Sequence, residues 1–234
     1  MSQDHLGLFD TPPSRTQVRF SLAVVCMLFA GFLGALPVRD FRLPEIIAFV
    51  PAIDAIMFVG DLITATLLYA QASVFRSRAL TVLASGFVFA ALLLIPHALT
   101  FPGAFAPDGL LGAGVNTTGW IYTFRRTAFP IAAILYVLLK RPNAASRPGA
   151  PRPAAKVGVG VLAAMVLSAA VALLATIGHD LLPPFFVNRA DLSFSGLVWH
   201  QSALAAVYVV GSSCCFGIAA RSLICGCWSP SRAG

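Results

Sequence analysis

The sequence predicts an all-α protein, a polytopic bundle of about six membrane-spanning helices with both termini in the cytoplasm. Its 234 residues are 58% hydrophobic and only 11% charged, whereas soluble domains contain about 25% charged residues. A helix needs roughly 20 apolar residues to cross the hydrocarbon core of a bilayer. Six runs have this length, at positions 18–36, 46–71, 79–97, 118–139, 157–177 and 198–219.

The distribution of positive charge predicts the orientation of the bundle. The segments on the side of the N-terminus carry eleven Lys and Arg residues, and those on the other side carry three. Because cytoplasmic loops are enriched in Lys and Arg, we expect the connection 96–120 to lie outside. The net charge of +7 is then a property of the inner face, and it indicates contact with anionic membrane lipid and not with nucleic acid.

The segment 96–130 is unusual for a connection between two spans. It is apolar, contains five glycines between Gly103 and Gly119, and has no Lys or Arg before Arg125. An ordinary surface loop is polar, so this composition indicates a segment that folds onto the helix bundle. We therefore expect the functional site here, with residues 99–118 as a lid.

Four ionisable residues fall inside predicted spans, where they are costly and indicate function. Asp54 and Asp61 are seven residues apart in the second span, so they share one helix face. Arg125 and Arg126 lie in the fourth span. Asp54 and Arg125 are both roughly 10–12 Å below the outer boundary, which predicts that they pair if their helices are neighbours. Such a pair would either hold the bundle together or form the floor of a pocket.

Histidine and tryptophan side chains fall near the outer ends of the predicted spans. His97 ends the third span, His200 begins the sixth, and Trp120 lies at the same level, where an aromatic belt is the common alternative explanation. The candidate ligand-binding residues are Asp54, Asp61, His97, Trp120, Arg125, Arg126 and His200.

No motif in the sequence indicates catalysis. No metal-ligand spacing and no pairing of a nucleophile with a base is apparent, so we predict a non-enzymatic protein without a metal site. The sequence does not identify a cofactor. The five cysteines lie in the first span and near the C-terminus, on the cytoplasmic side, where we expect free thiols.

Four motifs around these residues resemble a known family. They read DLITATLLYAQ (61–71), HALTFPGAF (97–105), GLLGAG (109–114) and TTGW (117–120). They resemble the fourth class of MASE domains, which are membrane-associated sensor domains of bacteria, and the similarity covers about residues 15–221. The resemblance implies a multi-pass input module of the bacterial cytoplasmic membrane. Such modules usually precede a cytoplasmic diguanylate cyclase (GGDEF) or histidine kinase domain.

The chain departs from the family pattern in two places. The family usually continues with further spans, whereas residues 222–234 form an atypical tail without an output domain, which we interpret as a C-terminal truncation. Arg125 and Arg126 stand where an aromatic residue and a histidine are expected. The predicted organisation is a cytoplasmic tail (1–17), the sensor domain (18–221, including a basic, proline-rich cytoplasmic loop at 140–156) and the tail (222–234).

Two functions remain open at this point. The first is a sensor whose stimulus changes helix packing and acts on a cytoplasmic signalling protein or on a second copy of the chain. The alternative is a small transporter or channel that uses Asp54 and Asp61 as ion or proton ligands. Transport would require a polar path to the inner face, and the third and fifth spans offer few polar residues for it.

Overall fold

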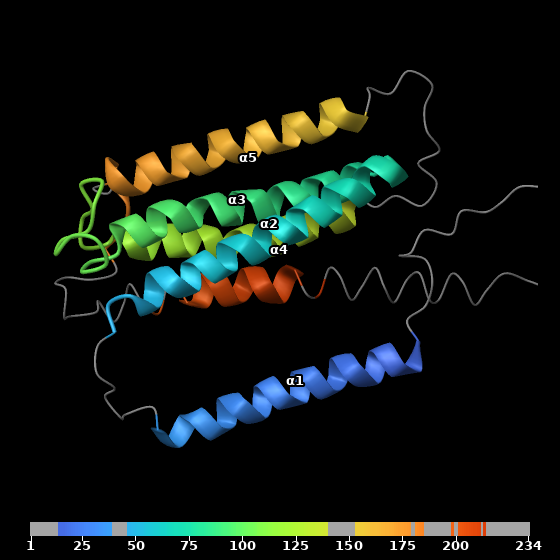
Figure 1. Cartoon of the computed structure of the whole chain (residues 1–234), viewed down its shortest axis with the longest axis horizontal. Helices are drawn as coiled ribbons and strands as arrows, with labels where there is room; N and C mark the ends of the chain where they lie inside the picture. Colours follow the sequence, from blue (N-terminus) through green and yellow to red (C-terminus); the bar gives the residue numbers. More distant parts are fainter. Residues whose placement is uncertain are drawn as a thin grey trace, which may run out of the picture. The chain divides into compact units, whose positions relative to one another are not determined.

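The structure, a computed structural model, describes residues 14–38, 46–139, 153–178, 181–184, 198, 201–211 and 213. Its elements in chain order are α1 (Arg15–Ala35), the 3-10 turn η1 (Leu36–Val38), α2 (Phe49–Phe75), α3 (Arg78–Thr100), α4 (Thr117–Leu139) and α5 (Pro153–Thr176) (Figure 1). The five α-helices are long and apolar enough to cross a membrane, which confirms the all-α membrane class. The sixth predicted span is described mainly over the helix Gln201–Gly211, so its full length stays a prediction.

The chain divides into two compact units, Met1–Ile46 and Ile47–Gly234. In the first unit, α1 begins with a capping box. The Ser14 hydroxyl accepts a hydrogen bond from Gln17 N at 3.2 Å, and the Gln17 side chain accepts one from Ser14 N at 2.8 Å. Two N–H groups of the first turn are thereby satisfied. Apolar side chains occupy all faces of α1 beyond this turn, which is typical of a helix in lipid.

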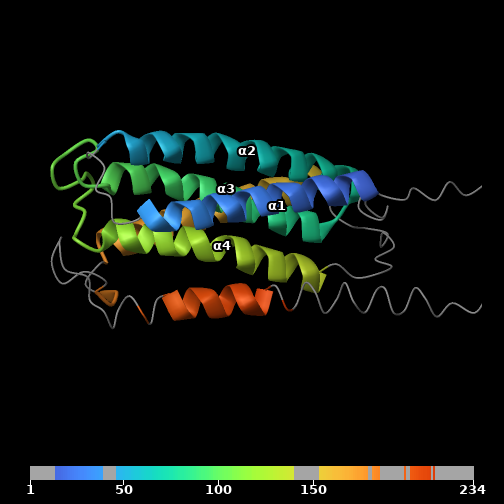
Figure 2. The same ribbon diagram turned by 90° about the horizontal axis from the view of Figure 1, so that it is seen from below.

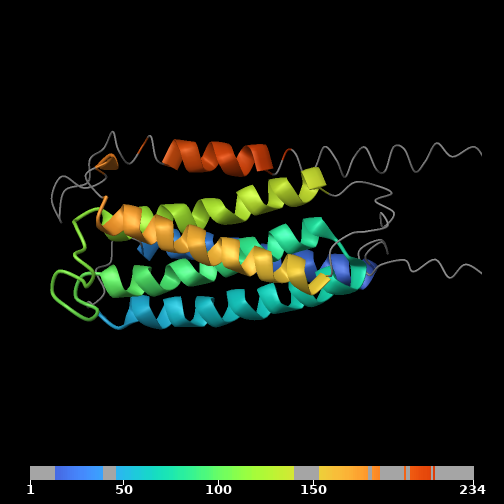
Figure 3. The same ribbon diagram turned by 90° about the horizontal axis from the view of Figure 1, so that it is seen from above.

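In the second unit, α3 is the central helix. It packs against α2, α4 and α5, and Figures 2 and 3 show it between α2 and α4. Small residues such as Ala84 and Ala91 are fully buried on α3, beside larger buried residues such as Leu93. Small side chains let helices approach closely in a membrane, where apolar burial alone provides little driving force for association. The segment Gln201–Gly211 lies along α4, with Gly211 against Ile134 and Pro130.

The connection 101–116 folds back onto the ends of the helices, as its composition predicts. Leu110 N donates to Leu99 O at 2.8 Å, and the Thr118 hydroxyl donates to Thr100 O at 2.9 Å. Residues 99–100 and 117–118, which were predicted to be part of the loop, belong instead to α3 and α4. Gly109 has φ +81°, and an added Cβ would collide with the Thr100 carbonyl oxygen. Gly109 therefore allows the loop to lie directly on the end of α3.

The substitution Gly109→Ala should destabilise the protein more than Gly112→Ala. Both glycines have positive φ, but space is open around Gly112. Gly112→Ala should therefore cost only the backbone term of about 1–2 kcal/mol, while Gly109→Ala should cost a further 1–3 kcal/mol or so for overpacking. Thermal unfolding in detergent measures the difference, and equal melting temperatures would show that the loop does not rest on α3.

Candidate functional site

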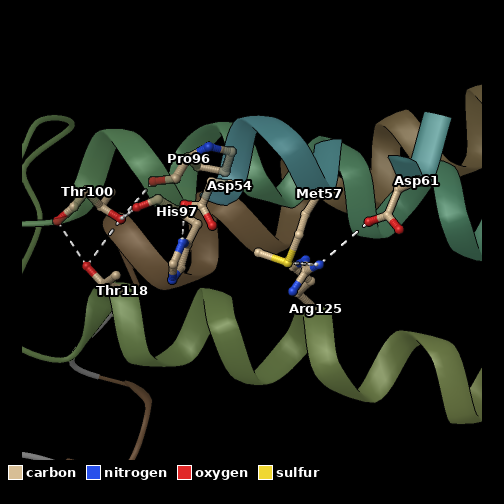
Figure 4. Close-up of polar contacts among 8 residues, drawn as sticks. All are labelled: Asp54, Met57, Asp61, Pro96, His97, Thr100, Thr118 and Arg125. Atoms are coloured by element: carbon tan, nitrogen blue, oxygen red, sulfur yellow. Dashed lines mark hydrogen bonds and ion pairs between the residues drawn. The ribbon is translucent and has the colours of Figure 1, made fainter. Parts of the chain in front are cut away.

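The two acidic residues of α2 face the bundle and have different partners. Asp54 is buried, and its Oδ2 lies 2.6 Å from Nδ1 of His97 on α3. Asp61, two turns further along the same face, has its Oδ2 3.6 Å from Nη2 of Arg125 on α4. Figure 4 shows these contacts in sequence along the bundle, beginning at the loop end with the hydrogen bond between Thr118 and Thr100. Polar side chains of α2 are thus connected to both α3 and α4.

The predicted pairing of Asp54 with Arg125 is wrong, although an Asp–Arg pair between these helices exists. His97 lies on the intervening helix and is the partner of Asp54. The Arg125 guanidinium instead contacts the next two turns of α2, at Met57 and Asp61. The estimated depths of these residues in the membrane therefore predicted the correct pair of helices, but they did not identify which aspartate of α2 pairs with Arg125.

The polar contacts of Arg125 are incomplete. Its Nη2 donates to the Met57 sulfur at 3.4 Å, and a thioether is a weak acceptor. The distance of 3.6 Å to Asp61 is too long for a hydrogen bond. Within the described part of the chain, Arg125 Nε and Asp61 Oδ2 are buried without any hydrogen-bond partner. Buried polar atoms are normally satisfied, so this arrangement has capacity for a further hydrogen-bonding group.

Two small cavities lie on either side of Arg125. One, of about 300 Å³, is bounded by α2, α3 and α4 and has Asp54, His97 and Tyr122 in its lining. The other, of about 220 Å³, has Asp61, Arg126 and Tyr208 in its lining. The remaining lining of both is largely apolar, with phenylalanine and aliphatic side chains. Such a combination of apolar walls and a few polar groups is typical of sites for small molecules.

Arg126 lines the second cavity and contacts two tyrosine residues. These contacts were not predicted from the sequence. Its Nη1 donates to the Tyr122 hydroxyl at 2.5 Å, and its guanidinium carbon lies 5.6 Å from the centre of that ring. The Tyr208 hydroxyl donates to the Arg126 carbonyl oxygen at 3.1 Å. The spacing of four residues between Tyr122 and Arg126 places them on one helix face and was the available signal for this contact.

Two other candidates are not brought into this group. The Trp120 indole N–H donates to Pro183 O at 3.1 Å and its ring packs on Phe124, so it lines neither cavity. His200 lies outside the described residues, as do the segment 140–152, the C-terminal tail and the four cysteines after Cys26.

The described residues contain no group of three potential metal ligands. Of the loop 101–116, Phe101 lines the larger of the two cavities, and the lid role of the loop stays a prediction.

A double-mutant cycle should show that Arg125 is coupled to Asp61 and not to Asp54. Arg125→Gln and Asp61→Asn each leave one unpaired charge in an apolar environment, so the double variant should be more stable than the sum of the single effects predicts. We expect a coupling free energy of about 1–2 kcal/mol, in the range measured for side chains in contact. Thermal unfolding in detergent provides the values.

The matched control cycle combines Arg125→Gln with Asp54→Asn. It should give a coupling energy near zero, because Asp54 has His97 as its partner. A larger coupling in this cycle than in the cycle with Asp61 would contradict the observed pairing.

Comparison with known proteins identifies the family. The sequence model described as "Membrane-associated sensor, integral membrane domain" (MASE4) matches residues 44–224. The matched region includes α2 to α5 and every residue that lines the two cavities, and it begins after α1. Neither the curated proteins nor the solved structures gave a match. The chain therefore belongs to the MASE4 family of integral membrane sensor domains.

Proposed function

We propose that this chain is a non-catalytic sensory input module of bacterial signalling in the cytoplasmic membrane. Its stimulus is a small molecule that binds in the cavities beside Arg125 and changes the packing of α2, α3 and α4. The response passes to a cytoplasmic signalling protein, of the diguanylate cyclase or histidine kinase class, or to a second copy of the chain. Family membership supports the sensory role.

The incomplete contact between Arg125 and Asp61 is the observation that carries this proposal. Arg125 is part of α4, yet its guanidinium contacts side chains of α2. A ligand with a carboxylate or hydroxyl group in either cavity would supply the hydrogen bond that Arg125 Nε lacks. Because that ligand would compete with Asp61 for Arg125, its binding free energy would depend on the relative positions of α2 and α4. A stimulus shifts an equilibrium only through such a difference.

α2 and α4 are continuous helices, so a movement at Arg125 can be transmitted to the other end of the bundle. α2 and α3 are joined by a short turn at Arg76 and Ser77, and the Ser77 hydroxyl accepts a hydrogen bond from Leu80 N at 3.3 Å. A displacement of α2 or α4 at Arg125 would therefore reach the end predicted to face the cytoplasm as a movement of whole helices. Helix shifts of this kind are a common element of switching proteins.

Neutralising Arg125 should change the distance between the inner ends of α2 and α4. Spin labels at Val74 and Leu138, which are exposed near these ends, allow this distance to be measured by pulsed electron paramagnetic resonance after the five cysteines are replaced by serine. Arg125→Gln should shift or broaden the distance distribution, because it removes the contact between the two helices.

Arg126→Gln is the matched control for this experiment. Arg126 is the neighbouring cation, and its side-chain contact with Tyr122 lies within α4. Its substitution should leave the distance unchanged. An unchanged distribution for Arg125→Gln, together with a lower melting temperature, would show that the pair only stabilises the bundle.

A flux measurement separates the sensor from the transporter. The ionisable side chains of these two cavities lie between the loop end and the middle of the bundle, and the adjoining space toward the start of α3 is lined mainly by apolar residues, which supports a binding site over a polar path through the protein. Proteoliposomes containing the protein should therefore show no flux of protons or alkali cations above that of empty liposomes. Flux that Asp61→Asn abolishes would assign transport instead.

A further inference from the structure

A third and larger cavity lies between α3, α4 and α5. It is a groove of about 940 Å³ toward the end of the bundle where α3 begins. Its sides are apolar residues such as Leu135 of α4 and Leu167 of α5, and Arg78 lies among the lining residues at the start of α3. The function proposed above does not use this groove.

Close helix contacts on α3 explain why the groove exists. An added Cβ at Gly160 of α5 would lie 2.6 Å from Ser85 Oγ, and one at Gly86 of α3 would lie 2.5 Å from the Ala132 Cβ of α4. Both α4 and α5 thus contact α3 where one partner is glycine. Between them, exposed residues such as Ala163 line the space, and α3 forms its floor.

The hydroxyl groups in the groove are satisfied within the protein. Ser85 Oγ lies 2.9 Å from Tyr69 OH and donates to Thr81 O at 2.9 Å. The Thr127 hydroxyl donates to Phe124 O at 2.9 Å. The hydroxyl donors of the groove are therefore already used, and burying a polar ligand there without hydrogen bonds would be unfavourable. A hydrocarbon chain suits the groove better.

The length of the groove matches one leaflet of a bilayer. Its lining extends from Arg78 to Phe89 on α3 and from Val159 to Val171 on α5. At 1.5 Å per residue these stretches are about 16 Å and 18 Å long. One leaflet contributes about 15 Å to the hydrocarbon core. An acyl chain that enters from the end predicted to face the cytoplasm would extend along the length of the groove.

Arg78 provides charge complementarity at the entrance. It is the first residue of α3, it is exposed, and in the described part of the chain no carboxylate lies within ion-pair distance of it. A guanidinium binds a phosphate group through two parallel hydrogen bonds. Arg78 thus lies where the phosphate of a lipid would be when its acyl chain occupies the groove.

We propose that this groove binds one anionic phospholipid of the inner leaflet, with its phosphate on Arg78 and one acyl chain between α4 and α5. The site differs from the cavities beside Arg125 in ligand chemistry, and it adjoins the smaller of them at Gly86 and Ala132. The proposal is based on the groove, on its satisfied hydroxyl groups and on Arg78 at its entrance, which has no carboxylate partner among the described residues.

Native mass spectrometry of the full chain tests the role of Arg78. Phosphatidylglycerol or phosphatidylcholine is added to the protein in detergent, the detergent is removed in the mass spectrometer, and the lipid that stays bound is measured. The wild type should retain one phosphatidylglycerol, with a preference of about fivefold over phosphatidylcholine, as expected for one cation at the membrane surface. Arg78→Gln should abolish this preference. Arg76→Gln, which removes a nearby exposed cation that does not line the groove, should preserve it.

A second pair of variants tests the acyl chain site. Ala163→Phe places a ring in the groove from an exposed position, so it should reduce retention of both lipids at least tenfold without burying new volume in the core. Ala169→Phe, at an exposed position of α5 outside the groove, should retain lipid as the wild type does. Circular dichroism verifies that each variant is helical.

Three results would overturn the proposal. One is an unchanged lipid preference in Arg78→Gln, and another is unchanged retention in Ala163→Phe. The third is a wild-type dimer without bound lipid that Ala163→Phe dissociates and Ala169→Phe does not, which would show that a second copy occupies the groove.

Discussion

The contact between Arg125 and Asp61 is the interaction on which the arrangement of α2 and α4 depends. Both helices pack on α3, and this ion pair joins them directly. An ionised group within a span is costly unless it is partnered, since the surrounding hydrocarbon offers no water to solvate it. The pair therefore restricts how α2 and α4 turn about their own axes. The hydrogen bond between Asp54 and His97 imposes the same restriction on α2 and α3, closer to the loop.

This restriction is needed because apolar side chains alone specify the bundle poorly. Lipid chains and leucine side chains are similar as solvents, so burying one against the other contributes little to helix association. In α3, specificity comes from small residues that permit close contact, such as Gly86 against Ala132, and from hydrogen bonds such as that between Ser85 and Tyr69. Close packing and polar contacts thus both help α3 to select its neighbouring helices.

Hydropathy and length were sufficient to predict the five described spans, because the bilayer imposes a simple requirement on each helix. The intramembrane Asp61 and Arg125 could be identified for a similar reason, since each is costly unless it is partnered. Their pairing could not be predicted, because sequence provides the depth of a residue but not the rotation of its helix. Trp120 illustrates the same limit. It lies near the depth of His97, yet it turns toward Pro183.

The groove between α4 and α5 could not be predicted from the sequence, for another physical reason. A residue such as Leu167 that lines an apolar groove has the same composition and period as one that faces lipid, so only the positions of neighbouring helices distinguish them. Arg78 is one of the eleven cations that predict the orientation of the bundle, and that orientation stays a prediction. Its place at the entrance of a groove became apparent only when α4 and α5 were seen on either side of α3.

The contact between α3 and α4 connects the two parts of the bundle. Gly86 and Ala132 line both the groove and the small cavity that contains Asp61 and Arg126. They are already at closest approach, since a Cβ on Gly86 would lie 2.5 Å from the Ala132 Cβ. At this point the two helices can slide or separate but cannot move closer together. A molecule that widened one cavity by separating α3 from α4 at this point would also widen the other, so binding at the two proposed sites would be coupled through the contact of Gly86 with Ala132.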